Sequence, residues 1–179
     1  GTPRAATLTT ADIEIAGPSA GMGTGTGYGV QITRVSRDNT YKLDLSSVYI
    51  HSFGNDGIKV SNAIVSTFDV VICEENAGHG FNIHGVSGGS AGTSCVFNVC
   101  YGNGNGQAGF HVDTMVYMQF NACAADSNGI AYEVIGASNH TQGLSFSGCG
   151  YEAPVNRSGS YPGIGWKING GAGIGLYNC

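Results

Sequence analysis

Short segments in which apolar and polar residues alternate recur along most of the chain. Each begins with a small residue and continues apolar, polar, apolar, which is the pattern of a β-strand with one buried face. The copies occupy residues 29–32, 57–60, 80–83, 109–112, 131–134 and 165–168. Stacked in register, their first apolar residues form one inward core row: Val30, Ile58, Phe81, Phe110, Tyr132 and Trp166.

A second set of segments interleaves with the first and ends in cysteine. Each has a large apolar residue three positions before the cysteine, and His51 ends an equivalent segment. Gly, Asn, Asp and Ser fill the gaps, and these residues tolerate the backbone of tight turns. The steps between copies are 22 to 30 residues, and the expected row is His51, Cys73, Cys100, Cys123, Cys149 and Cys179.

This repeat predicts an all-β parallel β-helix of about six coils, each stacked about 4.8 Å from the last. Leucine-rich repeats of similar length need a Leu/Asn consensus that the chain lacks. Helical repeats need residues that favour helices, and these are scarce in the chain. We expect one domain over residues 1–179. Because the chain stops on the core row at Cys179, we also expect a section of a longer protein or an end covered by a partner subunit.

Composition narrows the choice of partners. The 179 residues include only seven Lys and Arg and carry a net charge of -5. So few cations cannot neutralise a phosphate backbone, which predicts no nucleic-acid partner. No apolar run approaches the ~20 residues that span a bilayer, which predicts no membrane insertion. The acidic balance favours a neutral or weakly charged substrate.

The segment 73–83, with its pattern C-x-x-N…G-F-x-I, resembles the right-handed β-helix repeats of the pectate-lyase superfamily. Its cysteine-rich form is similar to repeats of phage tailspikes and tail appendages. The resemblance implies a right-handed β-helix, a homotrimer, a bacterial surface polysaccharide as partner, and a place in the virion or otherwise outside the cell. The superfamily includes lyases, hydrolases, epimerases and inert binding modules, so the fold does not select an activity.

The cysteines of the row are interpreted as reduced thiols that pack like small hydrophobic side chains. Disulfides are one alternative and zinc is another, although zinc needs ligands that converge tetrahedrally and a straight row does not converge. We expect no metal and no cofactor. Cys95 lies off the row and has no interpretation. Reduced thiols favour assembly in a reducing cytoplasm, and so a virion protein over a secreted enzyme.

Candidate chemistry gathers on two outward rows of the alternating segments. The first row is Gln31, Lys59, Asn82, His111, Glu133 and Lys167; the second is Thr33, Ser61, His84, Asp113, Ile135 and Asn169. Asp113 and Glu133 are expected about 8 Å apart, the spacing of an inverting glycosidase. Glu133, beside apolar neighbours, is the expected acid with a raised pKa, and Asp113 the base. Asn82, His84 and His111 are expected to hold sugar hydroxyls.

Other interpretations of this face stay open. In one interpretation it is an ordinary solvated sheet face. In another, the protein is a lyase, and His111 or His84 is its base near Lys59. The inserts at 84–93 and 136–143 flank the short connection after Asp113 and predict a trough. A competing row of Asn76, Asn103, Asp126 and Glu152 is expected at a turn, with Asp126 and Glu152 as the second carboxylate pair.

Two functions follow from these patterns. The first is a hydrolase or lyase that degrades surface polysaccharide as part of a phage tailspike. The second is a non-catalytic receptor-binding or spacer section of a tail protein. A secreted bacterial polysaccharide lyase is a further alternative.

Overall fold

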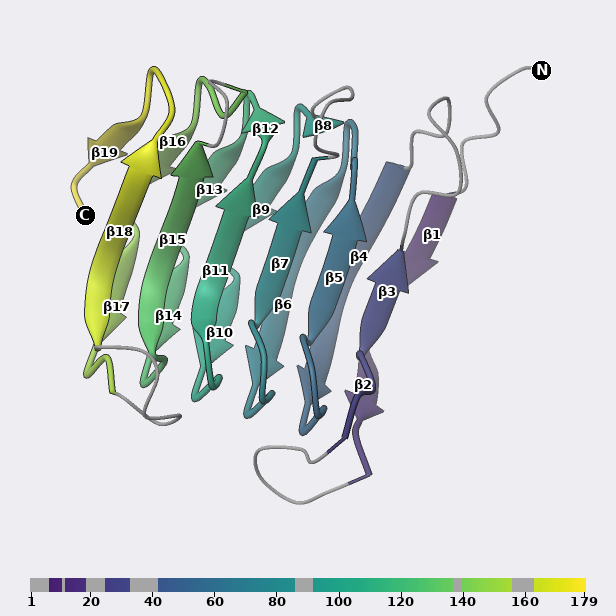
Figure 1. Ribbon diagram of the computed structural model, residues 1–179. Coiled ribbons are helices and arrows are strands. Elements are labelled where there is room, and N and C mark those ends of the chain that lie inside the picture. The colour runs from purple at the N-terminus through teal and green to yellow at the C-terminus, as the bar shows by residue number, and fades with distance from the viewer. Residues whose placement is uncertain are drawn as a thin grey trace.

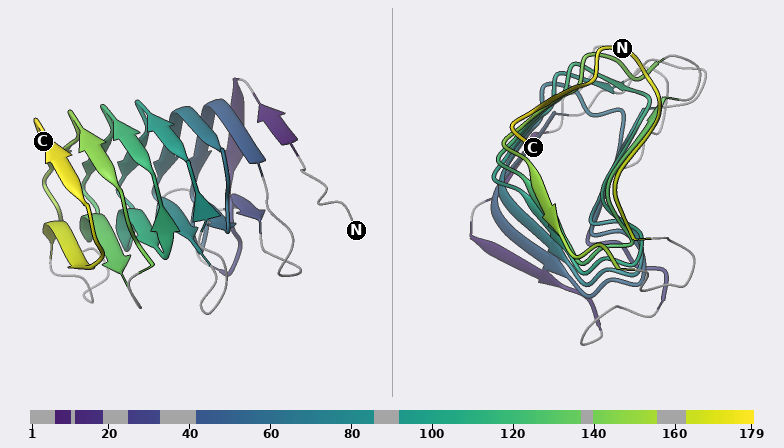
Figure 2. Two further views of the ribbon diagram at one scale, coloured as in Figure 1. Left: turned by 90° about the horizontal axis from the view of Figure 1, so that it is seen from above. Right: turned by 90° about the vertical axis from the view of Figure 1, so that its left-hand side faces the viewer.

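The computed structural model describes residues 7–10, 12–18, 25–32, 42–85, 92–136, 140–155 and 163–179. They form an all-β solenoid of about five turns, close to the six predicted. In Figure 1 the front strands run upward and the back strands downward while the coils advance from right to left, which makes the solenoid right-handed. Seen along its axis, successive coils superpose (Figure 2). Nowhere in the described ranges is there a helix long and apolar enough to cross a membrane.

One parallel sheet of six strands forms the front of the solenoid, and we call it sheet B (Figure 1). Its register confirms the predicted inward row, because Ile58, Phe81 and Phe110 are neighbours on adjacent strands. The same register continues to Tyr132 and Trp166. The strands are β3 (Val30–Ile32), β5 (Ile58–Ser61), β7 (Phe81–His84), β11 (Ala108–Asp113), β15 (Ile130–Gly136) and β18 (Ile164–Gly170).

A parallel sheet of eleven strands, sheet A, forms the back, and a pair of two-residue strands joins the sheets at the top (Figure 1). Its strands are β1 (Thr7–Thr10), β2 (Ile13–Ala16), β4 (Lys42–His51), β6 (Thr67–Glu74), β9 (Val96–Asn98), β10 (Tyr101–Asn103), β13 (Gln119–Asn121), β14 (Ala124–Asp126), β16 (Ser145–Ser147), β17 (Gly150–Glu152) and β19 (Gly175–Tyr177). The short pair is β8 (Gly92–Thr93) and β12 (Met115–Val116).

Residues with a left-handed backbone divide each coil at fixed places. One row of them bends sheet A in every coil, with φ from 49° to 61°: Ser47, Val70, Val99, Ala122, Gly148 and Asn178. A left-handed residue interrupts the strict alternation of a strand, as a bulge does. In the later coils this residue separates two short strands, such as β9 and β10, whereas β4 and β6 run through it as single longer strands.

Aromatic rings fill the interior in two stacks. The predicted stack on sheet B has ring centroids 4.6 Å apart for Phe81 and Phe110 and 5.1 Å apart for Phe110 and Tyr132. A second stack rises from sheet A, where Phe97 and Phe120 lie 4.7 Å apart. The two stacks meet edge to face, with an interplanar angle of 89° between Phe97 and Phe110. Both arrangements are favourable for aromatic quadrupoles, so they fix the coil spacing in the core.

The predicted cysteine row is wrong at its N-terminal end. Cys73 pairs with Ile50 and Gly102, and His51 pairs with Glu74, so neither lies in line with the later cysteines. Pairing of Asn98 with Asp69 and of Tyr101 with Ile72 places Cys100 beside Val71, two positions before Cys73. The observed row is Cys100, Cys123, Cys149 and Cys179.

The row thiols have a shared structural role. Cys100 donates to the carbonyl oxygen of Phe68, 3.3 Å away, and Cys123 donates to that of Phe97 at 3.6 Å. Cys149 and Cys179 repeat this contact with the Phe carbonyl one coil before. A thiol is a weak donor, and each of these contacts links a cysteine to the backbone of the preceding coil.

The predicted row of Asn76, Asn103, Asp126 and Glu152 is also wrong in one member. Asn103, Asp126 and Glu152 do align on adjacent strands, but Asn76 lies two positions further along its coil. It belongs to a ladder of fully buried asparagines with Asn105 and Asn128. Asn76 and Asn105 each donate to the asparagine of the next coil, and Asn105 and Asn128 donate to backbone carbonyls of the preceding coil. This ladder therefore closes the turn at the lower end of the coils.

Candidate functional site

The outward row of sheet B is placed as the sequence predicted. Lys59, Asn82 and His111 lie side by side on β5, β7 and β11. Glu133 and Lys167 continue the row on β15 and β18. Adjacent parallel strands lie about 4.8 Å apart, so neighbouring side chains of this row reach one another. The row is a straight line of polar groups along the solenoid axis.

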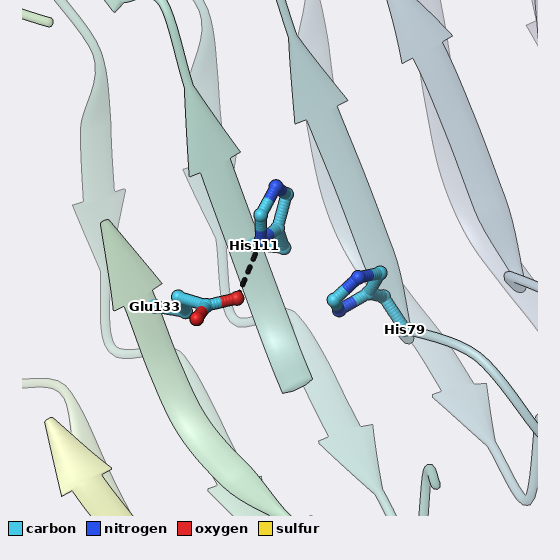
Figure 3. A group of neighbouring side chains, drawn as sticks. All are labelled: His79, His111 and Glu133. Atoms are coloured by element: carbon cyan, nitrogen blue, oxygen red, sulfur yellow. Dashed lines mark hydrogen bonds and ion pairs between the residues drawn. The ribbon is translucent and has the colours of Figure 1, made fainter. Parts of the chain in front are cut away.

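Three side chains of this row form a tight hydrogen-bonded cluster. Nδ1 of His111 lies 2.7 Å from Oε2 of Glu133, and Nζ of Lys167 donates to Oε1 of Glu133 at 2.7 Å. Glu133 is only 4 % exposed. Figure 3 shows the contact between the His111 ring and the carboxylate. Both carboxylate oxygens are therefore held by groups from the two neighbouring coils.

This arrangement contradicts the prediction that Glu133 has a raised pKa. The hydrogen bond from His111, and that from Lys167, outweigh the opposing effect of burial and lower the pKa of Glu133 from 4.5 to about 2. A charged carboxylate that accepts two charge-assisted hydrogen bonds is favoured over its protonated form. An ionised Glu133 fits a carboxylate that orients His111 better than it fits a general acid.

The same contact defines the chemistry of His111. With Glu133 ionised, the Nδ1–H of His111 donates a hydrogen bond to the carboxylate, so Nε2 is the ring nitrogen directed away from this contact. The His111 side chain is 15 % exposed, so the ring is reachable from solvent. A histidine whose tautomer and orientation are fixed by a buried carboxylate is the arrangement of an oriented general base.

His79 is a member of this site that the sequence analysis missed. Its ring centroid lies 4.5 Å from that of His111, and Figure 3 shows its ring directed toward His111 and Glu133. Burial, together with the nearby His111, lowers the pKa of His79 to about 3, so the ring is neutral. The sequence gives only a slight signal for this residue. Each alternating segment opens with a small residue, and the position just before it is apolar in the later coils but is Asp56 and His79 in two earlier coils.

The trio His79, His111 and Glu133 is poorly suited to a metal ion. Their ligand atoms lie within 4.8 Å of one another. However, Nδ1 of His79 accepts the backbone N–H of Ala108 at 3.1 Å. That bond uses the single lone pair of the neutral ring and leaves the proton on Nε2, so neither nitrogen has a lone pair free for a metal ion. Metal-bound histidines instead donate from their second nitrogen.

The other predicted site residues have different partners. Nδ2 of Asn82 donates to the buried Asp56, 2.9 Å away. His84 lies 3.1 Å from the Ser61 hydroxyl through Nε2 and 3.0 Å from the Gly85 carbonyl oxygen through Nδ1, so its Nδ1 carries the proton. Asp113 accepts a hydrogen bond from the Thr114 hydroxyl and pairs in register with Ile135. His111 and Glu133 are thus brought into contact, while the contacts of Asp113 lead elsewhere.

The second carboxylate pair serves the backbone. Oδ1 of Asp126 accepts the N–H of Glu152, and its Oδ2 accepts the Tyr101 hydroxyl, both at 2.7 Å. These bonds tie neighbouring coils of sheet A together.

The predicted trough lies partly outside the described residues, because its walls include residues 86–91 and 137–139. Shallow grooves formed by described residues lie on the sheet A side. One, of about 390 Å³, is lined by residues that include Ile13, Tyr49 and Val70. Another, of about 350 Å³, lies around Tyr117.

No protein-family model, curated protein or solved structure matches the chain. What the molecule itself establishes is a parallel β-solenoid that carries a His–Glu–Lys cluster on the exposed face of one sheet.

Proposed function

We propose that this β-helix cleaves a bacterial surface polysaccharide, with His111 as the general base. The observation that carries the proposal is the 2.7 Å contact between His111 and Glu133, with Lys167 on the second carboxylate oxygen. A parallel β-helix is compatible with proteins that act on polysaccharides. Because the pKa of Glu133 is lowered to about 2, a hydrolase mechanism with Glu133 as acid is disfavoured and elimination is favoured.

In this elimination, His111 Nε2 takes the proton from the carbon next to a uronate carboxylate. The C–O bond on the adjacent carbon breaks as the C=C bond forms, and the imidazolium returns the proton to the leaving glycosidic oxygen. Glu133 holds the ring in place and stabilises the imidazolium, as a carboxylate does for a catalytic histidine. The products are a new sugar end and an unsaturated uronate.

The distribution of positive charge supports a uronate as substrate. Within the described ranges there are three Lys and Arg residues, and two of them, Lys59 and Lys167, lie on the row of His111. Each is two strands away from β11, about 10 Å from strand spacing. Lys167 is paired with Glu133, so Lys59 supplies the net positive charge of the row, which suits an acidic polymer that runs along the solenoid axis. This local pattern replaces the expectation of a neutral substrate, which came from net charge alone.

The wider setting is part of the same proposal. The repeats resemble those of phage tailspikes, and all six cysteines are free. We place the protein in a phage tail as a homotrimeric β-helix that meets the host's surface glycan. The support for this placement is the repeat pattern and the reduced thiols.

A second candidate, a non-catalytic glycan-binding or spacer section, is favoured by a different observation. Most polar groups on the outward face of sheet B are engaged with their neighbours, such as Asn82 with Asp56 and His84 with Ser61. The grooves described above lie on the other sheet. Side chains that are engaged with one another form a fixed surface, which suits a section that binds a glycan or spaces other parts without catalysis.

The test is cleavage of capsular, lipopolysaccharide and teichoic acid preparations, followed by both unsaturated-uronate absorbance and new reducing ends. We expect both signals to appear together. His111→Ala should lower the rate at least about 100-fold, the usual scale of general-base catalysis. Glu133→Gln should also lower it, with a changed pH profile, because the ring loses its orienting carboxylate.

Asp113→Asn is the matched control, since it alters a carboxylate on the same strand and leaves the cluster intact. We expect it to retain near wild-type activity. Reducing ends without unsaturated uronate, with a strong effect of Asp113→Asn, would support the inverting hydrolase instead. No cleavage of any preparation would support the non-catalytic section.

A further inference from the structure

Tyr117 presents a large aromatic ring to solvent at one corner of its coil. Its φ is 54°, in the left-handed region, and it is 67 % exposed. The same corner is left-handed in the neighbouring coils, at Val65, Ser94, Gly143 and Gly173, so this backbone belongs to the fold. What distinguishes Tyr117 in this row is its ring, which is exposed and therefore contributes little to the core.

The backbone at this corner is hydrogen-bonded to the neighbouring coils, which fixes the place of Tyr117 in its coil. The N–H of Tyr117 donates to the carbonyl oxygen of Gln142 in the next coil, and the N–H of Ser94 donates to Val116. The ring rests against Gly143, where a Cβ would lie 2.8 Å from the ring's Cδ1. Glycine at 143 is therefore what lets the ring lie along the solenoid.

A shallow groove of about 350 Å³ adjoins the ring, at the small end of the range for ligand pockets. Its lining carries no formal charge. Besides Tyr117 it is formed by Ser94, Val96, Met118, Gln119, Gly143 and Ser145. The groove thus offers one aromatic surface, a small apolar floor, and hydroxyl and amide groups at its rim.

We infer that the Tyr117 groove, defined by these seven residues, binds a neutral sugar unit of a glycan. A pyranose ring has an apolar C–H face, which packs on an aromatic ring, and a rim of hydroxyls, which bond to Ser and Gln side chains. An uncharged lining favours an uncharged ligand, because a charged group entering it would lose hydration without gaining a partner. The site lies around the corner from His111, six residues further along the same coil.

The choice of a carbohydrate agrees with the proposed function and rests on it in part. The two sites differ in chemistry, however: His111 lies among charged groups, while the Tyr117 groove has none. A polymer that alternates acidic and neutral sugars has units suited to both.

The experiment is native affinity electrophoresis of the full chain, which migrates by virtue of its net charge of -5. The gels contain dextran, mannan, galactomannan or arabinogalactan as neutral probes. We expect retardation in at least one gel and at least fivefold weaker binding for Tyr117→Asn, since an aromatic contact contributes about 1 kcal/mol. Because Asn tolerates a left-handed backbone, the same variant should unfold at an equal or higher temperature.

Tyr151→Asn is the matched control. Tyr151 is 45 % exposed and rests against Gly165, but it lies on β17, away from the groove. We expect it to leave retardation unchanged. His111→Ala should abolish cleavage and also leave retardation unchanged, so failure of one proposal is separable from failure of the other.

Three outcomes overturn the inference. The first is no retardation of the wild type by any of the four polymers. The second is unchanged retardation of Tyr117→Asn. The third is a fall in molecular mass of Tyr117→Asn in sedimentation, which assigns the groove to contact between copies of the chain.

Discussion

At the scale of single residues, the chemistry of Glu133 depends on partners supplied by other coils. An isolated buried carboxyl group has a raised pKa, because burial disfavours its charged form. Here His111 and Lys167 reverse that effect and lower the pKa of Glu133 to about 2. The ion pairs hold three adjacent strands together on the exposed face, so Glu133 links the proposed catalytic function to stability.

This link predicts acid sensitivity. A carboxyl group whose pKa is lowered on folding stabilises the folded state fully above its unfolded value, about 4.5, and the contribution is lost as pH falls toward 2. The shift corresponds to about 3 kcal/mol. Urea unfolding between pH 7 and pH 2.5 should show this loss in the wild type and a flatter dependence in Glu133→Gln. Equal slopes for the two proteins would contradict it, and Asp113→Asn should keep the wild-type slope.

At the scale of elements, the asparagine ladder shows how a turn of the solenoid is closed. The side-chain oxygen of Asn105 accepts both the backbone N–H and the side-chain amide of Asn76, at 3.1 and 2.9 Å. Its own amide donates to the Cys73 carbonyl and to Asn128. One fully buried residue therefore satisfies polar groups in three coils. Buried groups left without such partners are costly, so the ladder fixes where each coil turns.

Two asparagines in one turn provide the test of this ladder. Asn105→Ala should lower the free energy of unfolding by about 3 kcal/mol or more, since it leaves several buried donors and acceptors without partners. Asn103→Ala, two residues away, removes a part-buried bond to Glu74, and should cost less than about 1 kcal/mol. Chemical denaturation measures both. A larger effect at Asn103 than at Asn105 would contradict the role assigned to the ladder.

At the scale of the whole molecule, the solenoid places most of its thiols where reagents cannot reach them. Cys73, Cys95, Cys100, Cys123 and Cys149 are buried and free, whereas Cys179 is exposed. Burial raises the pKa of the Cys73 thiol, and it raises that of Cys95 to about 11. Neutral, buried thiols are poor nucleophiles, so their reactivity reports the integrity of the whole core.

Thiol titration without reductant should therefore give two levels. In the native protein, one thiol, that of Cys179, should react quickly with an aromatic disulfide reagent. In denaturant, six should react. Two or more disulfides among the buried cysteines, seen as missing thiols after denaturation, would contradict the free-thiol core and the inference of assembly in a reducing compartment.

The rows of sheet B were predictable from the sequence. Alternation along a strand is a local property, and each copy starts with a recognisable small residue, so Phe81, Phe110 and Tyr132 align without knowledge of the fold. The same logic placed His111 beside Glu133. It could not assign their roles, because a pKa depends on the Lys167 partner 34 residues away and on burial.

The register of sheet A needed the tertiary structure. Left-handed residues such as Val70 and Val99 interrupt the alternation, and nothing in a valine signals a left-handed backbone. Aligning the segments by their cysteines therefore misplaced Cys73 by two positions. The stacking of Phe68 on Phe97 shows the true register of these strands. The sequence by itself determined the repeat, the core and the outward rows. Packing between coils decided the register of sheet A, the asparagine ladder and the charge state of Glu133, because each depends on neighbours that only the folded coil brings together.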